Sequence, residues 1–166
     1  MSSLEDRREP GEEGAPGRDE TEVEQLDRNL SELLQELRVA LPGVQVLFAF
    51  LLTVPFSQGF PGLSDFQRRA YFVVLALTAV STVLLIAPTA YHRVLFREGK
   101  RREIVTYSNR VVILGLGVLA LAMTTAVALI AHIVFDEAAA IITGILALTL
   151  FALLWYVLPL AVRRSG

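Results

Sequence analysis

Four long segments without a charged side chain restrict what this chain can fold into more than any other feature. They are residues 39–64, 70–91, 111–135 and 138–162. An α-helix rises about 1.5 Å per residue, so about 20 apolar residues are needed to cross the ~30 Å hydrocarbon core of a bilayer. Every segment is long enough, although two Pro-Gly pairs shorten the first. The sequence therefore predicts four transmembrane helices, over about 44–60, 70–91, 111–135 and 138–162.

A buried helix of a soluble protein is the alternative, and it requires a polar stripe along each helix. Residues 72–77 are six apolar residues in succession, which is more than one helical turn, so no face of this helix is polar. Composition points the same way, because 54% of the residues are hydrophobic and only 19% are charged, against about a quarter charged in soluble domains. We therefore expect an integral membrane protein. The absence of cysteine excludes disulfides, thiol catalysis and thiolate metal sites.

Lysine and arginine in short connections predict the orientation, since such residues face the cytoplasm. The segment 92–110 contains six of them: Arg93, Arg97, Lys100, Arg101, Arg102 and Arg110. The connection around Asp136 contains none, and the chain ends in a basic stretch, 163–166. With four crossings, both termini then lie in the cytoplasm and the protein lies in the cell (inner or plasma) membrane. Arg68 and Arg69, in the first connection, are the exception to this pattern.

The segment before the first span is acidic. Residues 1–38 carry twelve acidic and five basic side chains, a net charge of −7. Residues 1–20 have too few large apolar side chains to order themselves, so we expect a disordered acidic tail. In 21–41 an apolar residue recurs at alternating spacings of three and four, which predicts a cytoplasmic amphipathic helix. The residues are Val23, Leu26, Leu30, Leu33 and Leu37.

We expect Pro42-Gly43 to separate this amphipathic helix from the transmembrane domain, 42–162. Its polar face has a net charge of −3, whereas helices that lie on membranes usually present basic residues. The segment 92–110 has a net charge of +4 and lies on the same side of the membrane. The sequence therefore predicts that the amphipathic helix docks there.

Small residues indicate where the helices approach one another, because helices in bilayers associate by close packing. On the third span a ridge recurs every four residues, and two glycines precede it. The ridge is Ala120, Thr124, Ala128 and His132, and the glycines are Gly115 and Gly117. On the fourth span Ala140 and Gly144 form a similar pair. These patterns predict a compact bundle.

No residues have the spacing of a catalytic, cofactor-binding or metal site, so the sequence predicts neither an enzyme nor a cofactor. The candidate functional residues are of two kinds. Candidate contacts to anionic lipids or to the N-terminal tail are Arg93, Arg97, Lys100, Arg101 and Arg102. Membrane topology and lipid contact account for the basic charge of this segment, so we expect no nucleic-acid partner.

Gln45 and His132 are the candidate polar residues inside the membrane. Gln45 has two interpretations, a hydrogen bond to a neighbouring helix or the lining of a pore, and we favour the first. His132 and Asp136 are four residues apart and share a helical face, which suits a proton acceptor. We favour the alternative in which Asp136 caps the fourth helix and His132 lies at the outer interface.

Six short stretches resemble an uncharacterised family of small bacterial four-helix membrane proteins. They are 29–39 (NLSELLQELRV), 43–45 (GVQ), 47–53 (LFAFLLT), 87–93 (APTAYHR), 96–97 (FR) and 109–110 (NR). The resemblance covers roughly residues 25–160. It implies the four-helix fold and topology but no mechanism, although some members carry an automatic sodium:proton antiporter label.

The fold class that follows is all-α: a four-helix transmembrane bundle, preceded by a cytoplasmic amphipathic helix and a disordered acidic N-terminal tail. The function that we favour is that of a structural or accessory membrane protein without enzymatic activity. It would work as a homo-oligomer or with a membrane partner of unknown identity. The alternative is a small oligomeric ion or proton transporter, which usually requires ionisable residues inside the membrane.

Overall fold

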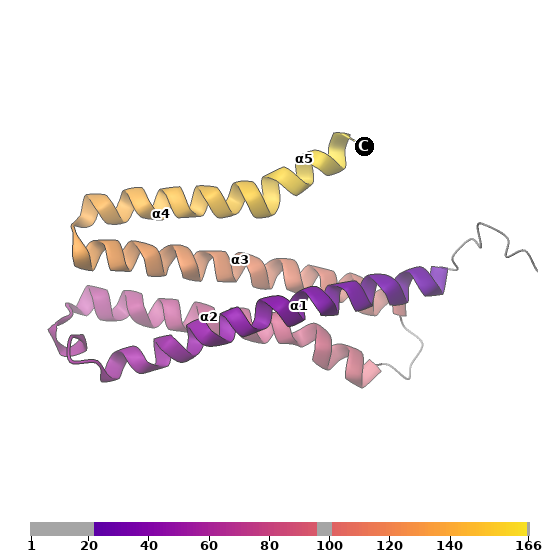
Figure 1. Ribbon diagram of the computed structural model, residues 1–166, viewed down its shortest axis with the longest axis horizontal. Coiled ribbons are helices and arrows are strands. Elements are labelled where there is room, and N and C mark those ends of the chain that lie inside the picture. Colours follow the sequence, from indigo (N-terminus) through magenta and orange to yellow (C-terminus); the bar gives the residue numbers. More distant parts are fainter. Residues whose placement is uncertain (1–21, 96–100, 166) are drawn as a thin grey trace, which may run out of the picture.

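The protein consists of helices that run side by side along one long axis (Figure 1). The computed structural model describes residues 22–95 and 101–165. In chain order the elements are α1 (Glu22–Thr53), two 3-10 turns η1 (Val54–Phe56) and η2 (Phe60–Gly62), α2 (Asp65–Leu95), α3 (Arg101–Val134), α4 (Glu137–Ala152), the π-helical turn η3 (Leu153–Val157) and α5 (Leu158–Ser165).

Four stretches are long and apolar enough to cross a membrane: Ser31–Phe56, Asp65–Tyr91, Ile104–Val134 and Glu137–Val162. Large apolar side chains are exposed along all of them, as lipid contact requires. These stretches include most of each predicted span. The chain is thus all-α, as predicted, and the four stretches indicate a multi-pass membrane protein.

The four long helices form an open arrangement. α1, α2 and α3 pack on one another, whereas among the described residues α4 has extensive helix contacts only with α3. Figure 1 shows α4 on the far side of α3 from α1 and α2. No residue of α4 is buried. The core is therefore a three-helix unit, and α4 is attached along one side of it.

Both described ends of the chain lie at one end of the molecule. α1 begins there, α2 ends there, α3 begins there and α5 ends there (Figure 1). We call this the terminal end. The opposite end carries the α1–α2 and α3–α4 connections, and we call it the connection end.

The predicted separation of an amphipathic helix from the first span is wrong. α1 runs without interruption from Glu22 to Thr53 with Pro42 inside it. A proline inside a helix costs about 3 kcal/mol, but the helix buries apolar side chains on both sides of it. Leu37, Val44 and Leu51 are seven residues apart, so they share a face, and all three are buried. The apolar seam before Pro42 thus continues into the span. The predicted tail, 1–20, lies outside the described residues.

The segment 92–110, predicted as a loop, is mostly helical. α2 extends to Leu95 and α3 begins at Arg101. Arginine and lysine are good helix formers. The basic charges therefore mark where the apolar span ends and do not end the helices.

Two clusters of buried side chains form the core between α1, α2 and α3. Leu37, Val44, Leu85 and Leu119 form the cluster nearer the terminal end, with Leu33 and Leu34 packed against it. Leu51, Tyr71 and Val74 form the second. The described apolar seam of α1 is thus covered by the bodies of α2 and α3. The side chains of 92–103 lie outside the described part, so their pairing with the acidic face of α1 stays a prediction.

A hydrogen bond from α2 completes the end of α1. The Tyr71 hydroxyl donates to the backbone carbonyl of Leu51 and is buried. The helical partner of that carbonyl would be the N–H four residues later, at Pro55, which has none. Tyr71 therefore supplies the donor that Pro55 lacks.

Glycines lie where α3 is approached by its neighbours, as predicted. A Cβ atom on Gly115 would lie 3.0 Å from Leu85 Cδ2, and the Ser81 hydroxyl of α2 donates to the Gly115 carbonyl at 2.9 Å. A Cβ atom on Gly117 would lie 2.8 Å from the hydroxyl oxygen of Tyr156. That hydroxyl donates to the Ile113 carbonyl at 2.9 Å and joins η3 to α3.

Candidate functional site

A cavity of about 460 Å³ lies between α2, α3 and α4 at the connection end. Its floor is one face of α3. Thr125, Ala128, Leu129 and His132 contribute to it, and their spacing of three, one and three residues places them on the same side of a helix. The Thr125 hydroxyl donates to the Leu121 carbonyl at 2.8 Å, so its hydrogen-bonding demand is met within α3.

The two walls come from the first turns of α2 and α4. Phe66 and Ala70 line the α2 side, and Glu137, Ala140 and Ile141 line the α4 side. An alanine stands on each of the three helices at the cavity, at positions 70, 128 and 140. These short side chains leave the volume open. Farther along α4 the space closes, because a Cβ atom on Gly144 would already lie 3.3 Å from that of Ala128.

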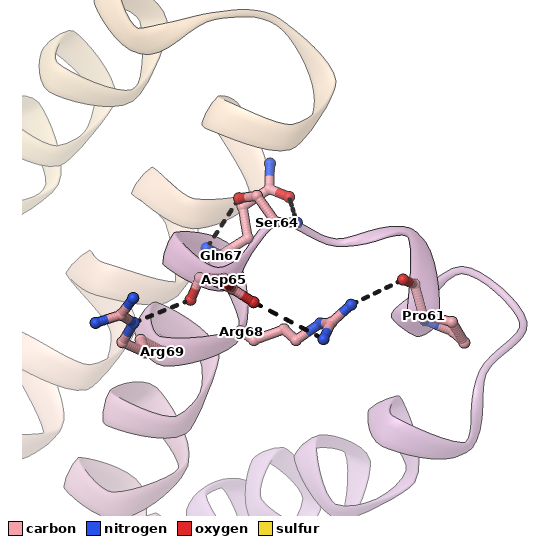
Figure 2. Close-up of polar contacts among 6 residues, drawn as sticks. All are labelled: Pro61, Ser64, Asp65, Gln67, Arg68 and Arg69. Carbon is pink, nitrogen blue, oxygen red and sulfur yellow. Dashed lines mark hydrogen bonds and ion pairs between the residues drawn. The ribbon is translucent and has the colours of Figure 1, made fainter.

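A capping box fixes the first turn of α2 and therefore the position of Phe66. The Ser64 N–H donates to Gln67 Oε1 at 2.9 Å, and the Gln67 N–H donates to Ser64 Oγ at 3.3 Å. Figure 2 shows this reciprocal pair beside Arg68 and Arg69.

Arg68 and Arg69, which depart from the expected charge pattern, make local contacts at the start of α2. Arg68 Nη2 donates to the Pro61 carbonyl at 2.9 Å, and Arg68 Nη1 lies 3.9 Å from Asp65 Oδ1. Arg69 Nε donates to the Asp65 carbonyl at 3.4 Å. Arg68 therefore holds the α1–α2 connection against the start of α2, whereas the Arg69 contact lies within α2 (Figure 2).

Asp136 fixes the start of α4, as we favoured from the sequence. Its backbone is extended, with φ −156°, and its carboxylate accepts the Ala139 N–H at 2.8 Å. This is an N-cap. Glu137 follows in the first turn, where the partial positive charge of the helix N-terminus favours a carboxylate. No ion pair joins Glu137 to another residue in the described part of the chain.

His132 lies at the connection end, one helical turn before Asp136, and is half-buried. Its ring packs edge to face on Phe66, with 5.6 Å between the ring centroids and 75° between the planes. The imidazole thus forms part of the cavity floor beside Glu137, while the carboxylate of Asp136 caps α4.

Gln45 lies on an exposed face of α1. No described residue of the chain pairs with Gln45, so both interpretations, a hydrogen bond to a neighbouring helix and the lining of a pore, stay predictions. Threonines in the helices differ from Gln45, because their hydroxyls can donate back to a carbonyl of the preceding turn. Thr78, Thr82 and Thr143 all do so, at 2.8, 2.8 and 2.7 Å.

Two hydroxyls in the core have no such partner. Ser108 Oγ and Thr124 Oγ1 are buried without a hydrogen bond to the described residues. Thr124 belongs to the predicted small-residue ridge of α3, and its neighbour Ala120 is also buried. The other two members of the ridge, Ala128 and His132, line the cavity. The ridge thus has two parts: Ala120 and Thr124 pack in the core, and Ala128 and His132 line the cavity.

Three of the predicted basic contacts, Arg93, Arg101 and Arg102, lie on helices at the terminal end, remote from the cavity. Arg93 is in the last turn of α2, and Arg101 and Arg102 begin α3. Their side chains, together with Arg97 and Lys100, lie outside the described part. Their binding of anionic lipid or of the N-terminal tail stays a prediction.

Sequence reasoning missed most of the cavity. Phe66, Thr125 and Glu137 line it but were not singled out. The spacing from Thr125 to His132 was a readable signal of a shared helical face, whereas nothing in the sequence pairs that face with α2 and α4. Among the described residues, no group of three or more His, Cys, Asp or Glu side chains is placed to hold a metal ion.

One comparison with known proteins gives a match. The model of a family described as "Family of unknown function (DUF6328)" matches residues 19–159, which is most of the chain. No curated protein and no solved structure matches.

Proposed function

We propose that this chain, which belongs to the DUF6328 family of unknown function, is a non-enzymatic accessory protein of the cell membrane that acts by self-association within the bilayer. The family assignment supplies no activity, so the proposal rests on the chain's own geometry. The observation that carries it is the exposed amide of Gln45.

Gln45 lies close to the middle of the candidate span Ser31–Phe56. Transferring a polar group into an apolar environment without a hydrogen-bond partner costs roughly 2–7 kcal/mol. Gln45 is exposed, and no described residue of the chain pairs with it. A hydrogen-bond partner from a second chain removes this cost.

A second copy suits this position for a chemical reason. A primary amide both donates and accepts hydrogen bonds, so two Gln45 side chains related by a twofold axis satisfy each other. Ala49 lies one turn further on the same exposed face, and its short side chain allows two helices to approach closely. Val46 and Phe50, which are exposed beside them, supply apolar contact area.

The orientation in the membrane is part of the proposal. Both termini are cytoplasmic, and the terminal end contacts anionic lipid through the basic segment 92–110. The six basic residues of that segment support this. The position of both described chain ends at the same end of the molecule is consistent with it.

A single introduced cysteine tests the self-association, because the chain contains no cysteine of its own. We expect Ala49→Cys to form a disulfide-linked dimer upon mild oxidation in native membranes. Ala152→Cys, at an exposed position near the end of α4, is the matched control and should cross-link far less.

Gln45→Leu in the Ala49→Cys background should lower the cross-linked fraction severalfold. Gln58→Leu makes the same chemical change at an exposed position in the α1–α2 connection and should leave the fraction unchanged. Equal cross-linking at Ala49 with and without the Gln45 amide would overturn the proposal.

A small oligomeric proton or ion transporter is the second candidate, favoured by His132 and Glu137 in one cavity. A proton carrier has to serve both sides of the membrane, whereas both residues lie at the connection end. We therefore expect proteoliposomes to show no sodium- or pH-gradient-driven flux beyond that of empty vesicles. Robust flux that disappears in His132→Ala would establish the transporter and overturn the accessory function.

A further inference from the structure

We propose that the cavity at the connection end binds one phospholipid whose headgroup ends in a primary ammonium. One acyl chain lies between α2 and α4 on the floor formed by α3, and the ammonium group pairs with Glu137. This site is separate from the α1 face used in self-association.

Size and lining support a ligand site. A volume of about 460 Å³ falls within the range of small-molecule sites, which are mostly apolar with a few placed polar groups. Here the apolar part comes from Ala70, Leu129 and Ile141, and the polar part from His132 and Glu137.

The position of the cavity selects a lipid over a water-soluble ligand. α3 lies between α2 and α4, which have no extensive contact with each other in the described part of the chain. The space above α3 therefore opens sideways, between two helices that are exposed to the hydrocarbon. A lipid enters such a site from the bilayer without crossing water.

The charges at the cavity select the headgroup. Glu137 is an exposed carboxylate without an ion pair to a described residue, and Asp136 adds a second negative charge beside it while capping α4. In the first turn of α2, Arg68 pairs with Asp65, whereas the Arg69 guanidinium donates to the Asp65 carbonyl and keeps its positive charge, which suits the phosphate of a zwitterionic lipid. An ammonium group therefore finds its counter-charge at Glu137.

His132 supplies the second point of recognition. Its imidazole N–H can donate a hydrogen bond to an ester or phosphate oxygen of the same lipid. Phe66 packs against the ring edge to face and holds it at the floor of the cavity. A primary ammonium has three donors for the carboxylate, whereas a quaternary ammonium has none. The site is thus expected to prefer the former.

Native mass spectrometry of the full chain in detergent tests the proposal. The probes are phosphatidylethanolamine, phosphatidylcholine and phosphatidylglycerol with identical acyl chains. We expect one tightly retained phosphatidylethanolamine. Because the ion pair with an exposed carboxylate is partly screened by water, Glu137→Gln should weaken its retention severalfold. The same variant should leave phosphatidylglycerol binding unchanged.

Two cavity-filling variants and one matched control separate the cavity from the general lipid surface. Ala128→Phe and Ala140→Phe fill the space from different helices and should abolish the retained lipid. Ala138→Phe introduces the same side chain at an exposed position in the first turn of α4 and should not. Each variant is first checked for retained helix content and thermal unfolding.

Either of two results overturns the proposal. One is equal retention of all three lipids by the parent chain. The other is retention of phosphatidylethanolamine by both filled variants at the parent's level. The dimer test is independent, because Gln45→Leu is expected to leave lipid retention unchanged.

Discussion

Backbone carbonyls that side chains of another helix satisfy are the smallest features on which this fold depends. The Leu51 carbonyl is one such group, since Pro55 cannot donate to it and Tyr71 does. In a lipid environment water is not available to replace a lost donor. The proline and the tyrosine, sixteen residues apart in the sequence, therefore act as a pair.

We expect Tyr71→Phe to destabilise the protein by about 0.5–2 kcal/mol, because it leaves the Leu51 carbonyl without a partner. The phenyl ring keeps the edge-to-face contact with Phe60, which isolates the hydroxyl. Reversible unfolding in mixed micelles measures the change. Tyr107→Phe, at an exposed tyrosine, is the control. Equal stability of both variants would contradict the assigned role.

A double-mutant cycle tests the contact between α3 and η3. Gly117→Ala places a Cβ atom 2.8 Å from the Tyr156 hydroxyl oxygen, so the hydroxyl has to leave the Ile113 carbonyl. We expect a loss of about 1 kcal/mol in the parent chain. In the Tyr156→Phe background the nearest remaining atom, Cζ, lies 3.8 Å away, and the same substitution should cost nothing. Identical costs in both backgrounds would show that the two residues are not coupled.

At the scale of the helix, α1 shows which sequence signals are reliable. The spacing of Leu33 and Leu37 predicted an apolar helix face, and both residues pack in the core. The prediction that Pro42 ends a helix was wrong, because packing on both sides of Pro42 outweighs one missing hydrogen bond. Likewise, the charges at 92–110 marked the limits of the apolar spans and gave no information on where α2 ends and α3 begins.

We expect Leu33→Asp and Leu37→Asp to loosen α1, because each places a carboxylate in the apolar cluster. Amide hydrogen exchange along α1 should accelerate at least tenfold in both. Gln35→Asp introduces the same side chain at an exposed position and should have little effect. Glu32→Ala removes only an exposed ion pair with Arg28, at 3.8 Å, so it too should have little effect. The same exchange in all four variants would contradict this packing.

At the scale of the whole molecule, the sequence predicted the helical class and the approximate spans, but the cavity was not readable. It is formed by three helices whose contributing residues lie far apart in the sequence, and its position depends on how each helix is rotated. The partner of Gln45 was not readable for the same reason. A glutamine near the middle of a span indicates a hydrogen bond but does not say whether the partner belongs to the same chain.

The topology of the molecule is tested with reporter fusions. We expect green fluorescent protein attached after Gly166 to fluoresce, which requires a cytoplasmic C-terminus. Alkaline phosphatase attached at Glu137 should be active, because the α3–α4 connection contains no lysine or arginine. Phosphatase activity from a fusion at Lys100 would reverse the orientation.

In the described part of the chain α4 packs extensively only on α3, and this has a consequence for synthesis. Chains are made from the N-terminus, and early segments assemble before later ones are complete. The contacts among α1, α2 and α3 involve no residue of α4, so a nascent chain that ends before Glu137 already contains every partner they need. The fourth helix then joins a finished three-helix unit, and the cavity exists only once this last insertion has taken place.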